Sequence, residues 1–303
     1  MLSIIIPSHN AASRTLETAR RHLQAASHIG DEVEILIVDD GSRAEERKLL
    51  LSEDNDRIRV IETQANLGRG GAVNFGAQAS RGEHLLIVDC DCPPALPTFL
   101  AEHLRAMAAG ADASVGHLQR RCDDFWGHYQ DCAVERRERQ FANGISYAFT
   151  SQNVMINAHW FGRIGGFDTA YTKYGFEDRD FFIRLASAGA RIVYTPDAAV
   201  IHDDENIRLA TISLKMRDAG AFSAPYFAQH HPREYVQLGY AALDARRRPW
   251  LRPVGLIVGG AAMTAAPRLD AWLLRMPFTM GRAIASAVTA LAYLNGTCSQ
   301  STD

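Results

Sequence analysis

The stretch LLIVDCDCPP, residues 85–94, places two aspartates one residue apart at the end of an apolar run. The run is typical of a β-strand that is buried on both faces. Residues i and i+2 of an extended segment point to the same side, so Asp89 and Asp91 would face one way and Cys90 and Cys92 the other. Two carboxylates on one side of a strand end suit a hard divalent cation. Alternatively, they only end the strand and open a turn before the two prolines.

A regular alternation of strands and helices surrounds this stretch. Strands are predicted at residues 2–8, 32–42, 57–63 and 83–91, with one or two more within residues 191–204. Helices are predicted at residues 11–26, 44–51, 68–80, 120–140 and from about 177. This rhythm predicts an α/β fold with a doubly wound, mostly parallel sheet. Ligands bind beyond the carboxyl ends of the strands in such sheets, so the polar residues that end strands are the candidate site residues.

Composition and charge narrow the class of protein. Of the 303 residues, 47% are hydrophobic and 22% charged, which is ordinary for a globular protein, and the net charge of −3 gives no support for a nucleic-acid partner. The five cysteines are an odd number and suggest no disulfide framework. The sequence shows no signal peptide and no apolar run of about 18 residues, so we expect a cytoplasmic protein.

A second acidic pair ends another predicted strand. Asp39 and Asp40, in IVDDGS, would lie on the same edge of the sheet as the first pair. A carboxylate there could accept hydrogen bonds from a base imide or a ribose hydroxyl. Asp-Gly is also an ordinary turn dipeptide, so this motif alone is ambiguous.

The glycine segment NLGRGGAVNFG raises the possibility of a nicotinamide-dependent dehydrogenase. Gly68 and Gly70 fit the first two positions of the dinucleotide fingerprint G-x-G-x-x-G, but Val73 occupies the third. The segment also follows the third predicted strand rather than the first. Both departures disfavour a dehydrogenase.

Seven motifs in order, SIIIPSHN, VDDGS, NLGRGGAVNFGA, VDCD, GGFD, GFEDRDF and VIHDD, span residues 2–204. Together they resemble the family-2 inverting glycosyltransferases, which have the A-type glycosyltransferase fold. The segment GGFDTAYTKYGFEDRDFFIRL also resembles the C-terminal acceptor region of galactosyl- and N-acetylgalactosaminyltransferases. The resemblance implies a nucleotide-diphospho-sugar transferase domain over residues 1–205, with a donor half to about 95 and an acceptor half from about 96. A helical extension over residues 206–303 would follow.

The resemblance also implies roles for the matching residues. The donor, expected to be a UDP-sugar, would be bound by Pro7, Asp39, Asp40, Asn66, Arg69 and Asp89. A divalent cation, manganese or magnesium, would be bound by Asp91, Asp89 and His202. Asp178 would be the catalytic base, with Glu177 beside it. Phe176 stands where the family more often has tryptophan or glycine, which affects the choice of acceptor rather than the reaction.

Several of these residues have a second interpretation. Glu177 and Asp178 fall at a predicted helix start, where the helix dipole alone favours acidic residues. His202, on an apolar strand, is either a metal ligand or a hydrogen-bonded histidine of the sheet. Cys90 and Cys92 are expected to pack as small hydrophobic side chains, because a thiolate metal site needs about four ligands.

The predicted reaction transfers a sugar from a nucleotide diphosphate to a hydroxyl of a glycan, a lipid-linked sugar or another acceptor, in glycan or polysaccharide biosynthesis. A carboxylate base assists a single, inverting displacement, and a divalent ion stabilises the leaving diphosphate. Two alternatives stay open. A nucleotidyltransferase would carry a glycine-rich basic loop where this chain reads PSHNAASR. A non-catalytic protein would bind the sugar nucleotide without turnover.

The last hundred residues lie beyond the resemblance. A basic run, ARRRPWLR (245–252), precedes the apolar stretch PVGLIVGGAAMTAA (253–266), and a second apolar stretch (272–294) is interrupted by two arginines and a proline. Neither stretch is long enough to cross a bilayer cleanly. These helices either cover the catalytic domain or form a homodimer interface, or else they lie as a peripheral element at the inner face of the membrane, near lipid-linked acceptors.

Overall fold

The computed structural model describes residues 1–203 and 207–299 of the chain. Two compact units are formed, and they interleave along the sequence. The first unit comprises Met1–Arg121, Asp131–Thr169 and Phe181–Asp204; the second comprises Cys122–Gln130, Ala170–Asp180 and Glu205–Asp303. The domain boundary at residue 205 therefore stays a prediction, and the two units are described separately.

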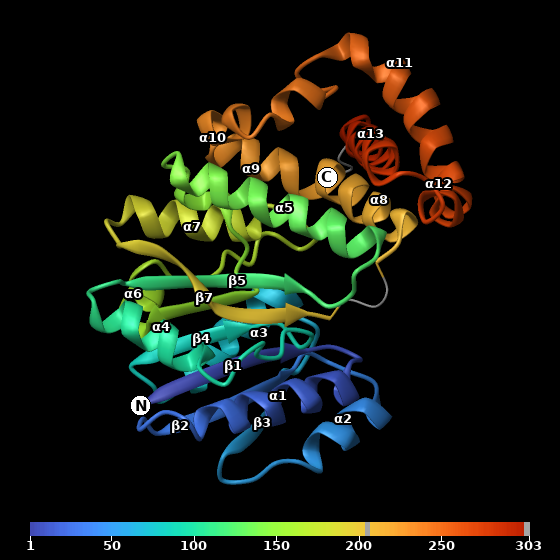
Figure 1. Cartoon of the computed structure of the whole chain (residues 1–303). Coiled ribbons are helices and arrows are strands. Elements are labelled where there is room, and N and C mark those ends of the chain that lie inside the picture. Colours follow the sequence, from blue (N-terminus) through green and yellow to red (C-terminus); the bar gives the residue numbers. More distant parts are fainter. Residues whose placement is uncertain (204–206, 300–303) are drawn as a thin grey trace. The chain divides into compact units, whose positions relative to one another are not determined.

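The first unit is built on one seven-stranded sheet with the order β3-β2-β1-β4-β6-β5-β7 (Figure 1). Its strands are β1 (Leu2–Ser8), β2 (Val33–Asp39), β3 (Ile58–Glu62), β4 (His84–Val88), β5 (Ala113–Arg120), β6 (Asn153–Asn157) and β7 (Ile192–His202). Only β6 runs antiparallel to its neighbours, β4 and β5. The prediction of an α/β fold with a mostly parallel sheet is confirmed.

Helices cover both faces of this sheet. The helices are α1 (Ala12–Ala26), α2 (Ala44–Leu51), α3 (Gly68–Ala79), α4 (Phe99–Ala108), α6 (Ala158–Arg163) and parts of α5 (Phe125–Ala142) and α7 (Glu177–Ser187). Alternate residues of β1 pack against the helices on opposite faces of the sheet. Ile4 and Ile6 pack with α1, α2 and α4, whereas Ile5 packs with α3, α6 and α7. Because both of their faces are buried, the central strands β1, β2 and β4 read as nearly continuous apolar runs.

The prediction for the strand that carries the acidic pair was wrong at its end. We predicted a strand to residue 91, but β4 ends at Val88, and Asp89 to Cys92 form a turn closed by a bond from Cys92 N to Asp89 O (3.0 Å). The alternation of an extended segment therefore does not set the directions of the two aspartates. Pro93 and Pro94, which cannot donate to a ladder, follow the turn directly.

Two buried histidines lie on either side of Phe99 in the core of the first unit. The ring centroids of His22 and His103 are 5.4 and 5.1 Å from that of Phe99. His22 Nε2 bonds Cys92 O (3.1 Å), and His103 bonds Ser114 Oγ (2.8 Å) and an amide oxygen (2.9 Å). Burial lowers the pKa of each histidine to about 4, so both rings are neutral in the folded protein at pH 7.

These two histidines are expected to make the protein unstable in mild acid. Below pH 6.5 the unfolded chain binds protons that the folded chain does not accept until about pH 4. The free energy of unfolding should therefore be highest above pH 6.5 and fall by about 1 kcal/mol per pH unit for each histidine in that window. Urea unfolding from pH 7.5 to 4.5 measures this slope. His22→Gln should halve it while the exposed control His28→Gln leaves it unchanged; an unaltered slope in His22→Gln would contradict the assignment.

The second unit is helical after residue 207, as predicted. Its elements there are α8 (Leu209–Asp218), the π-helical η2 (Ala219–Ser223), α9 (Ala224–His230), α10 (Pro232–Gln237), η3 (Tyr240–Leu243), η4 (Pro249–Leu251), α11 (Arg252–Val254), the π-helical η5 (Gly255–Gly259), α12 (Gly260–Leu273) and α13 (Phe278–Thr297). Close packing of α13 uses glycine: a Cβ on Gly296 would lie 2.0 Å from Arg217 O. Within the described residues, no helix is both long and apolar enough to cross a membrane.

Candidate active site

The carboxyl ends of six parallel strands, β1, β2, β3, β4, β5 and β7, meet at one edge of the sheet in the first unit. Ser8 at the end of β1 is in register with Asp39 of β2, and Arg120 at the end of β5 is in register with His202 of β7. Between them, Val88 ends β4. The sheet therefore brings the ends of the motifs that were predicted to hold the donor and the metal to a common edge.

The Asp39–Asp40 pair is buried, with exposed fractions of 1% and 3%. Asp39 Oδ1 accepts a bond from Ser42 N (3.2 Å). Asp40 Oδ1 accepts bonds from Leu67 N (2.7 Å) and Thr63 Oγ1 (3.1 Å). These bonds fix the two loops that surround the end of β2. Contacts of either carboxylate with a donor nucleotide stay a prediction.

His9 is a residue of this edge that the sequence analysis did not single out. Its Nδ1 lies 2.8 Å from the carbonyl oxygen of Asp40, and its Nε2 lies 2.8 Å from Nδ2 of Asn10. The ring is exposed and bridges the loops that follow β1 and β2. The motif SIIIPSHN, at the end of the first strand, was the available signal.

Asn66 and Pro7, two further residues predicted to bind the sugar donor, contact neighbouring residues of the first unit. Asn66 lies beside His9, with Nδ2 3.1 Å from Nδ1 of the ring, and its Oδ1 accepts from Gly68 N (3.0 Å). Pro7 is buried within β1, in register with Val38. Neither observation tests a contact with a donor.

Arg69 and Asp89 form an ion pair at the edge. Arg69 Nε donates to Asp89 Oδ1 (2.6 Å), and its two terminal nitrogens donate to Ser151 Oγ (2.8 Å) and Ser151 O (3.0 Å). The side chains of the pair are 25% and 19% exposed. One oxygen of Asp89 is thus bonded by a cationic side chain.

Asp91 and His202 are brought together by backbone pairing. The segment after the β4 turn runs antiparallel to the end of β7, with bonds from Ile201 N to Pro93 O (2.9 Å) and from Asp203 N to Asp91 O (2.8 Å). As a result, Asp91 Oδ2 lies 3.9 Å from His202 Nε2, and both side chains are about one fifth exposed, at 18% and 19%. A carboxylate oxygen and an imidazole nitrogen thus approach one another, and Gln152 Nε2 lies 3.2 Å from the same imidazole nitrogen.

A divalent cation between Asp91 and His202 would have few protein ligands. Among residues 1–203 and 207–299, no group of three or more His, Cys, Asp or Glu side chains is placed to hold a metal. Magnesium in phosphate sites usually takes one or two protein ligands and completes its shell with water and substrate phosphates. Asp91 and His202 fit an ion bound in that way, and they do not form a closed structural site.

The predicted base belongs to the second unit. The helix α7 begins at Glu177, and its first turn holds Glu177, Asp178 and Asp180. Asp180 was not singled out from the sequence: it is 3% exposed and Oδ1 lies 2.8 Å from His231 Nε2. No sequence signal links residues 51 positions apart, so this pair could not be predicted. The role of Asp178 as base stays a prediction.

Phe176, just before this helix, has a left-handed backbone with φ of +72°. Left-handed backbone is uncommon for a bulky residue. Its ring stacks on Phe227 at 4.7 Å and meets Tyr240 edge-on at 4.9 Å, within the second unit. These aromatic contacts hold Phe176, and with it the start of α7, in the strained conformation.

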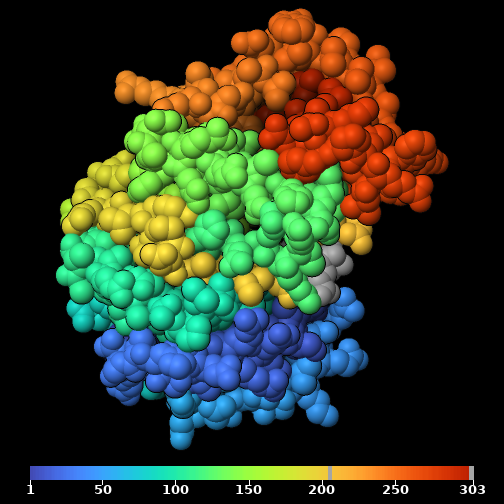
Figure 2. Space-filling view, in the orientation of Figure 1, coloured from blue at the N-terminus to red at the C-terminus, as the bar shows by residue number. Residues whose placement is uncertain are grey.

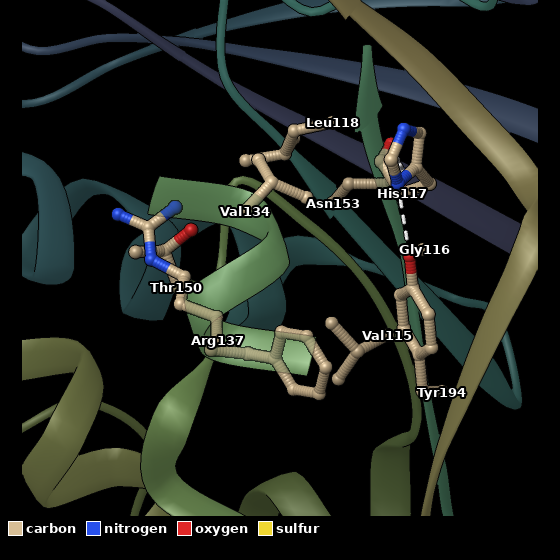
Figure 3. Close-up of a pocket in the computed structure, with 10 residues that line it drawn as sticks. Val115, Gly116, His117, Leu118, Val134, Arg137, Thr150, Asn153 and Tyr194 are labelled. Carbon is tan, nitrogen blue, oxygen red and sulfur yellow. Dashed lines mark hydrogen bonds between the residues drawn. The ribbon is translucent and has the colours of Figure 1, made fainter. Parts of the chain in front are cut away.

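A small pocket lies on the β5 side of the same edge. It is lined by Val115, Gly116, His117, Leu118, Val134, Arg137, Phe149, Thr150, Asn153 and Tyr194 (Figure 3). In Figure 3 His117 and Tyr194 point toward one another, with 2.9 Å between Nδ1 and the hydroxyl. Burial, followed by the carboxylate of Glu138, raises the pKa of Tyr194 well above its usual value. Thr150, which lines the pocket, donates to Gln152 Oε1 (3.0 Å), and Gln152 Nε2 lies 3.2 Å from His202 Nε2.

The cysteines of the opening stretch pack as predicted. Cys92 is fully buried among the side chains of α1, α4 and the sheet, and Cys90 packs against the same cluster. Burial, followed by the charges of Asp91 and Asp89, raises the pKa of Cys90 to about 12. Neither thiol is available as a thiolate near pH 7.

Comparison with known proteins assigns the family. The family model described as "Glycosyl transferase family 2" matches residues 3–165, and one described as "N-terminal domain of galactosyltransferase" matches residues 134–204. Dolichyl-phosphate beta-glucosyltransferase of Mus musculus is 34% identical over 104 residues, which are 30% of this chain and 31% of that protein. Undecaprenyl-phosphate 4-deoxy-4-formamido-L-arabinose transferase of Shewanella sediminis is 28% identical over 48% of this chain and 42% of that protein. The matches therefore span less than half the length of these relatives.

Two solved structures share the fold. A mannosyltransferase from Pyrobaculum calidifontis in complex with GDP-Man and Mn2+ aligns with a TM-score of 0.62 and 19% identity, over 98% of this chain and 85% of that one. GalNAc-T7 with UDP, GalNAc and Mn2+ aligns with a TM-score of 0.52 and 18% identity, over 67% of this chain and 43% of that one. Since the family 2 model covers more than half of the chain, this protein is a glycosyltransferase that belongs to glycosyl transferase family 2.

Proposed function

We propose that this glycosyltransferase moves a sugar from a UDP-sugar to an acceptor hydroxyl, with inversion at the anomeric carbon and with the help of a divalent cation. The observation that carries the proposal is the approach of Asp91 and His202, at 3.9 Å, beside the Arg69–Asp89 pair at the carboxyl edge of the sheet. This is the position at which doubly wound folds bind nucleotides.

Asp91 and His202 would hold the cation, either manganese or magnesium. A nitrogen ligand favours manganese, since magnesium prefers oxygen. Mn2+ in two structures of the same fold supports this choice. When bound, the ion would supply Lewis acidity that neutralises the charge of the leaving diphosphate.

The remaining roles belong to side chains of the chain itself. Asp39 and Asp40 would bind the uracil and ribose, while Asn66 and Arg69 would contact the nucleotide, with Arg69 kept in place by Asp89 and Ser151. Asp178, assisted by Glu177, would take the proton of the acceptor hydroxyl as that oxygen attacks. Such general-base assistance typically contributes about 10²- to 10⁴-fold.

The names of two relatives support a proposal for the acceptor class. Their names describe transfer involving dolichyl phosphate and undecaprenyl phosphate, two lipid phosphates. We infer that the acceptor is lipid-linked, with a glycan acceptor as the second choice, and that the enzyme serves glycan or polysaccharide assembly at the cytoplasmic face of a membrane.

Thermal-shift and turnover measurements together test this function. UDP-sugars with Mn2+ should raise the melting temperature by a few degrees, since a ligand at about 100 times its dissociation constant stabilises by about 2.7 kcal/mol. GDP-mannose, which carries guanine in place of uracil, is the matched control for recognition of the nucleobase. Release of UDP on addition of a polyprenyl-linked sugar, whose hydroxyl is the acceptor, supports the transferase. Binding without release would favour the non-catalytic alternative, and pyrophosphate release from UTP and a sugar phosphate would favour a nucleotidyltransferase.

A further inference from the structure

The π-helical segment η5 of the second unit has its small residues inside and its large apolar residues outside. Gly255 and Gly259 pack on α13: a Cβ on Gly255 would lie 2.5 Å from Cys298 Sγ, and one on Gly259 would lie 2.8 Å from Leu291 O. Leu256, Ile257 and Val258, the residues between the glycines, are 53%, 72% and 47% exposed. A helix on the surface of a globular protein normally shows the reverse arrangement.

The outward apolar side chains continue beyond this segment. The other exposed large apolar residues between residues 246 and 283 are Trp250 (68%), Val254 (38%), Trp272 (64%), Leu274 (60%) and Met280 (53%). In Figure 1 the ribbon from α11 through α12 curves around the outside of α13, and in Figure 2 the orange and red side chains of these elements stand at the surface. We call the exposed side chains of residues 246–283 the outer C-terminal surface.

The charge of this surface is of one sign. Its exposed charged side chains are all arginines: Arg246, Arg247, Arg248, Arg252, Arg268, Arg275 and Arg282. Of these, Arg246 is paired with the buried carboxylate of Asp244 (2.8 Å), so the other six carry the positive charge of the surface. The only acidic residue in this range is Asp270, whose carboxylate accepts a bond from Leu209 N (2.6 Å) at the start of α8. The whole chain has a net charge of −3, so positive charge is concentrated where the apolar side chains are exposed.

We propose that the outer C-terminal surface binds the anionic headgroup layer of a lipid bilayer, lying in the interface without spanning it. Apolar side chains enter the boundary between headgroups and acyl chains, and tryptophan rings prefer that zone. Arginines meet anionic headgroups, and each basic residue near such a surface raises partitioning about fivefold. The inference does not depend on the proposed sugar transfer.

Charge also separates this partner from a second copy of the chain. A two-fold dimer through this surface would place the same patch on both sides of the interface and set arginines against arginines. Like charges in that arrangement oppose association. An anionic bilayer provides both an apolar region for the exposed apolar side chains and negative charge for the arginines.

Sedimentation of the full-length protein with lipid vesicles tests the proposal. The protein should pellet with vesicles of phosphatidylglycerol and phosphatidylcholine at low salt, far less with phosphatidylcholine alone, and less as salt rises. The triple variant Arg248→Gln, Arg268→Gln, Arg275→Gln should partition about 100-fold more weakly. The triple variant Leu256→Ser, Ile257→Ser, Val258→Ser should lose at least about tenfold.

Two matched controls lie in the first unit: the exposed Leu96, at 55%, changed to serine, and the exposed Arg57 changed to glutamine. Both should bind vesicles like the unaltered protein. Because every replaced residue is exposed, the variants should keep the melting temperature of the parent. Binding to phosphatidylcholine alone as strong as to the anionic mixture would contradict the proposal.

Tryptophan fluorescence gives a second readout that does not use turnover. Trp250 and Trp272 are largely exposed, whereas Trp126 is 6% exposed. Vesicle binding should shift the emission to the blue, and the double variant Trp250→Phe, Trp272→Phe should bind without that shift. A protein that stays in the supernatant at low salt, or that instead forms dimers abolished by the serine triple variant, would overturn the proposal.

Discussion

Replacing Asp91 with alanine is expected to lower metal-dependent sugar transfer about 10³-fold, because an ion that stabilises the leaving diphosphate is worth several kcal/mol. The carboxylate of Asp91 lies 3.9 Å from the imidazole of His202, and the variant would leave the ion a single protein ligand of this pair. The backbone bond from Asp203 N to Asp91 O does not involve the side chain, so the fold should be kept. Steady-state UDP release at increasing Mn2+ measures the effect.

The matched control for this change is Asp197→Ala, which removes an exposed carboxylate from β7. It should turn over like the parent. Asp89→Ala should also lower transfer, because Arg69 loses the carboxylate that holds it in place. The loss should be smaller than in Asp91→Ala. Parental turnover with an unchanged Mn2+ dependence in Asp91→Ala would sink the assignment of the metal site.

The second large effect is expected from Asp178→Asn, which should reduce transfer by about 10²- to 10⁴-fold and leave donor affinity unchanged. The amide keeps the shape of the side chain but cannot take the proton of the acceptor hydroxyl. Asp178 stands in the first turn of α7, so losing its charge should cost only about 0.3–1 kcal/mol of stability. Calorimetry with a UDP-sugar and Mn2+, followed by turnover at saturating donor, separates the two effects.

The neighbouring acids give the contrast for this variant. Asp180→Asn should mainly lower stability, because it removes the negative charge from the buried contact with His231 at 2.8 Å. Glu177→Gln should retain more activity than Asp178→Asn. If Asp178→Asn instead lost donor affinity while transfer at saturating donor persisted, the base would have to be another residue.

The first four strands could be predicted from the sequence because each is a short apolar run followed by a turn motif. The segment 113–120, ASVGHLQR, mixes apolar and polar residues, and 153–157, NVMIN, is only five residues long. Neither pattern predicts a strand by itself, and the insertion of antiparallel β6 between β4 and β5 depends on tertiary contacts. The strand order of the acceptor half was therefore beyond the reach of the sequence.

The candidate site, like the sheet, could be predicted from the sequence only in part. That acidic strand ends share one edge followed from the parallel topology alone. The contacts that shape the edge join residues far apart: Arg69 with Ser151, Gln152 with His202, and the main chain of Asp91 with that of Asp203. Each depends on the position of β6 or β7, which local patterns do not contain. His9 was within reach, since it directly follows the first strand.

The interleaving of the two units has a consequence for attempts to isolate a minimal catalytic fragment. Phe125 and Trp126 lie in a hydrophobic cluster with Leu209, Leu273 and Val288 of the second unit. A fragment cut at the predicted boundary, residue 205, would keep these aromatic side chains and lose the helices that bury them. Phe176 would likewise lose Phe227, the ring on which it stacks. Such a fragment would expose these aromatic side chains to solvent, so we expect it to aggregate where the whole chain does not.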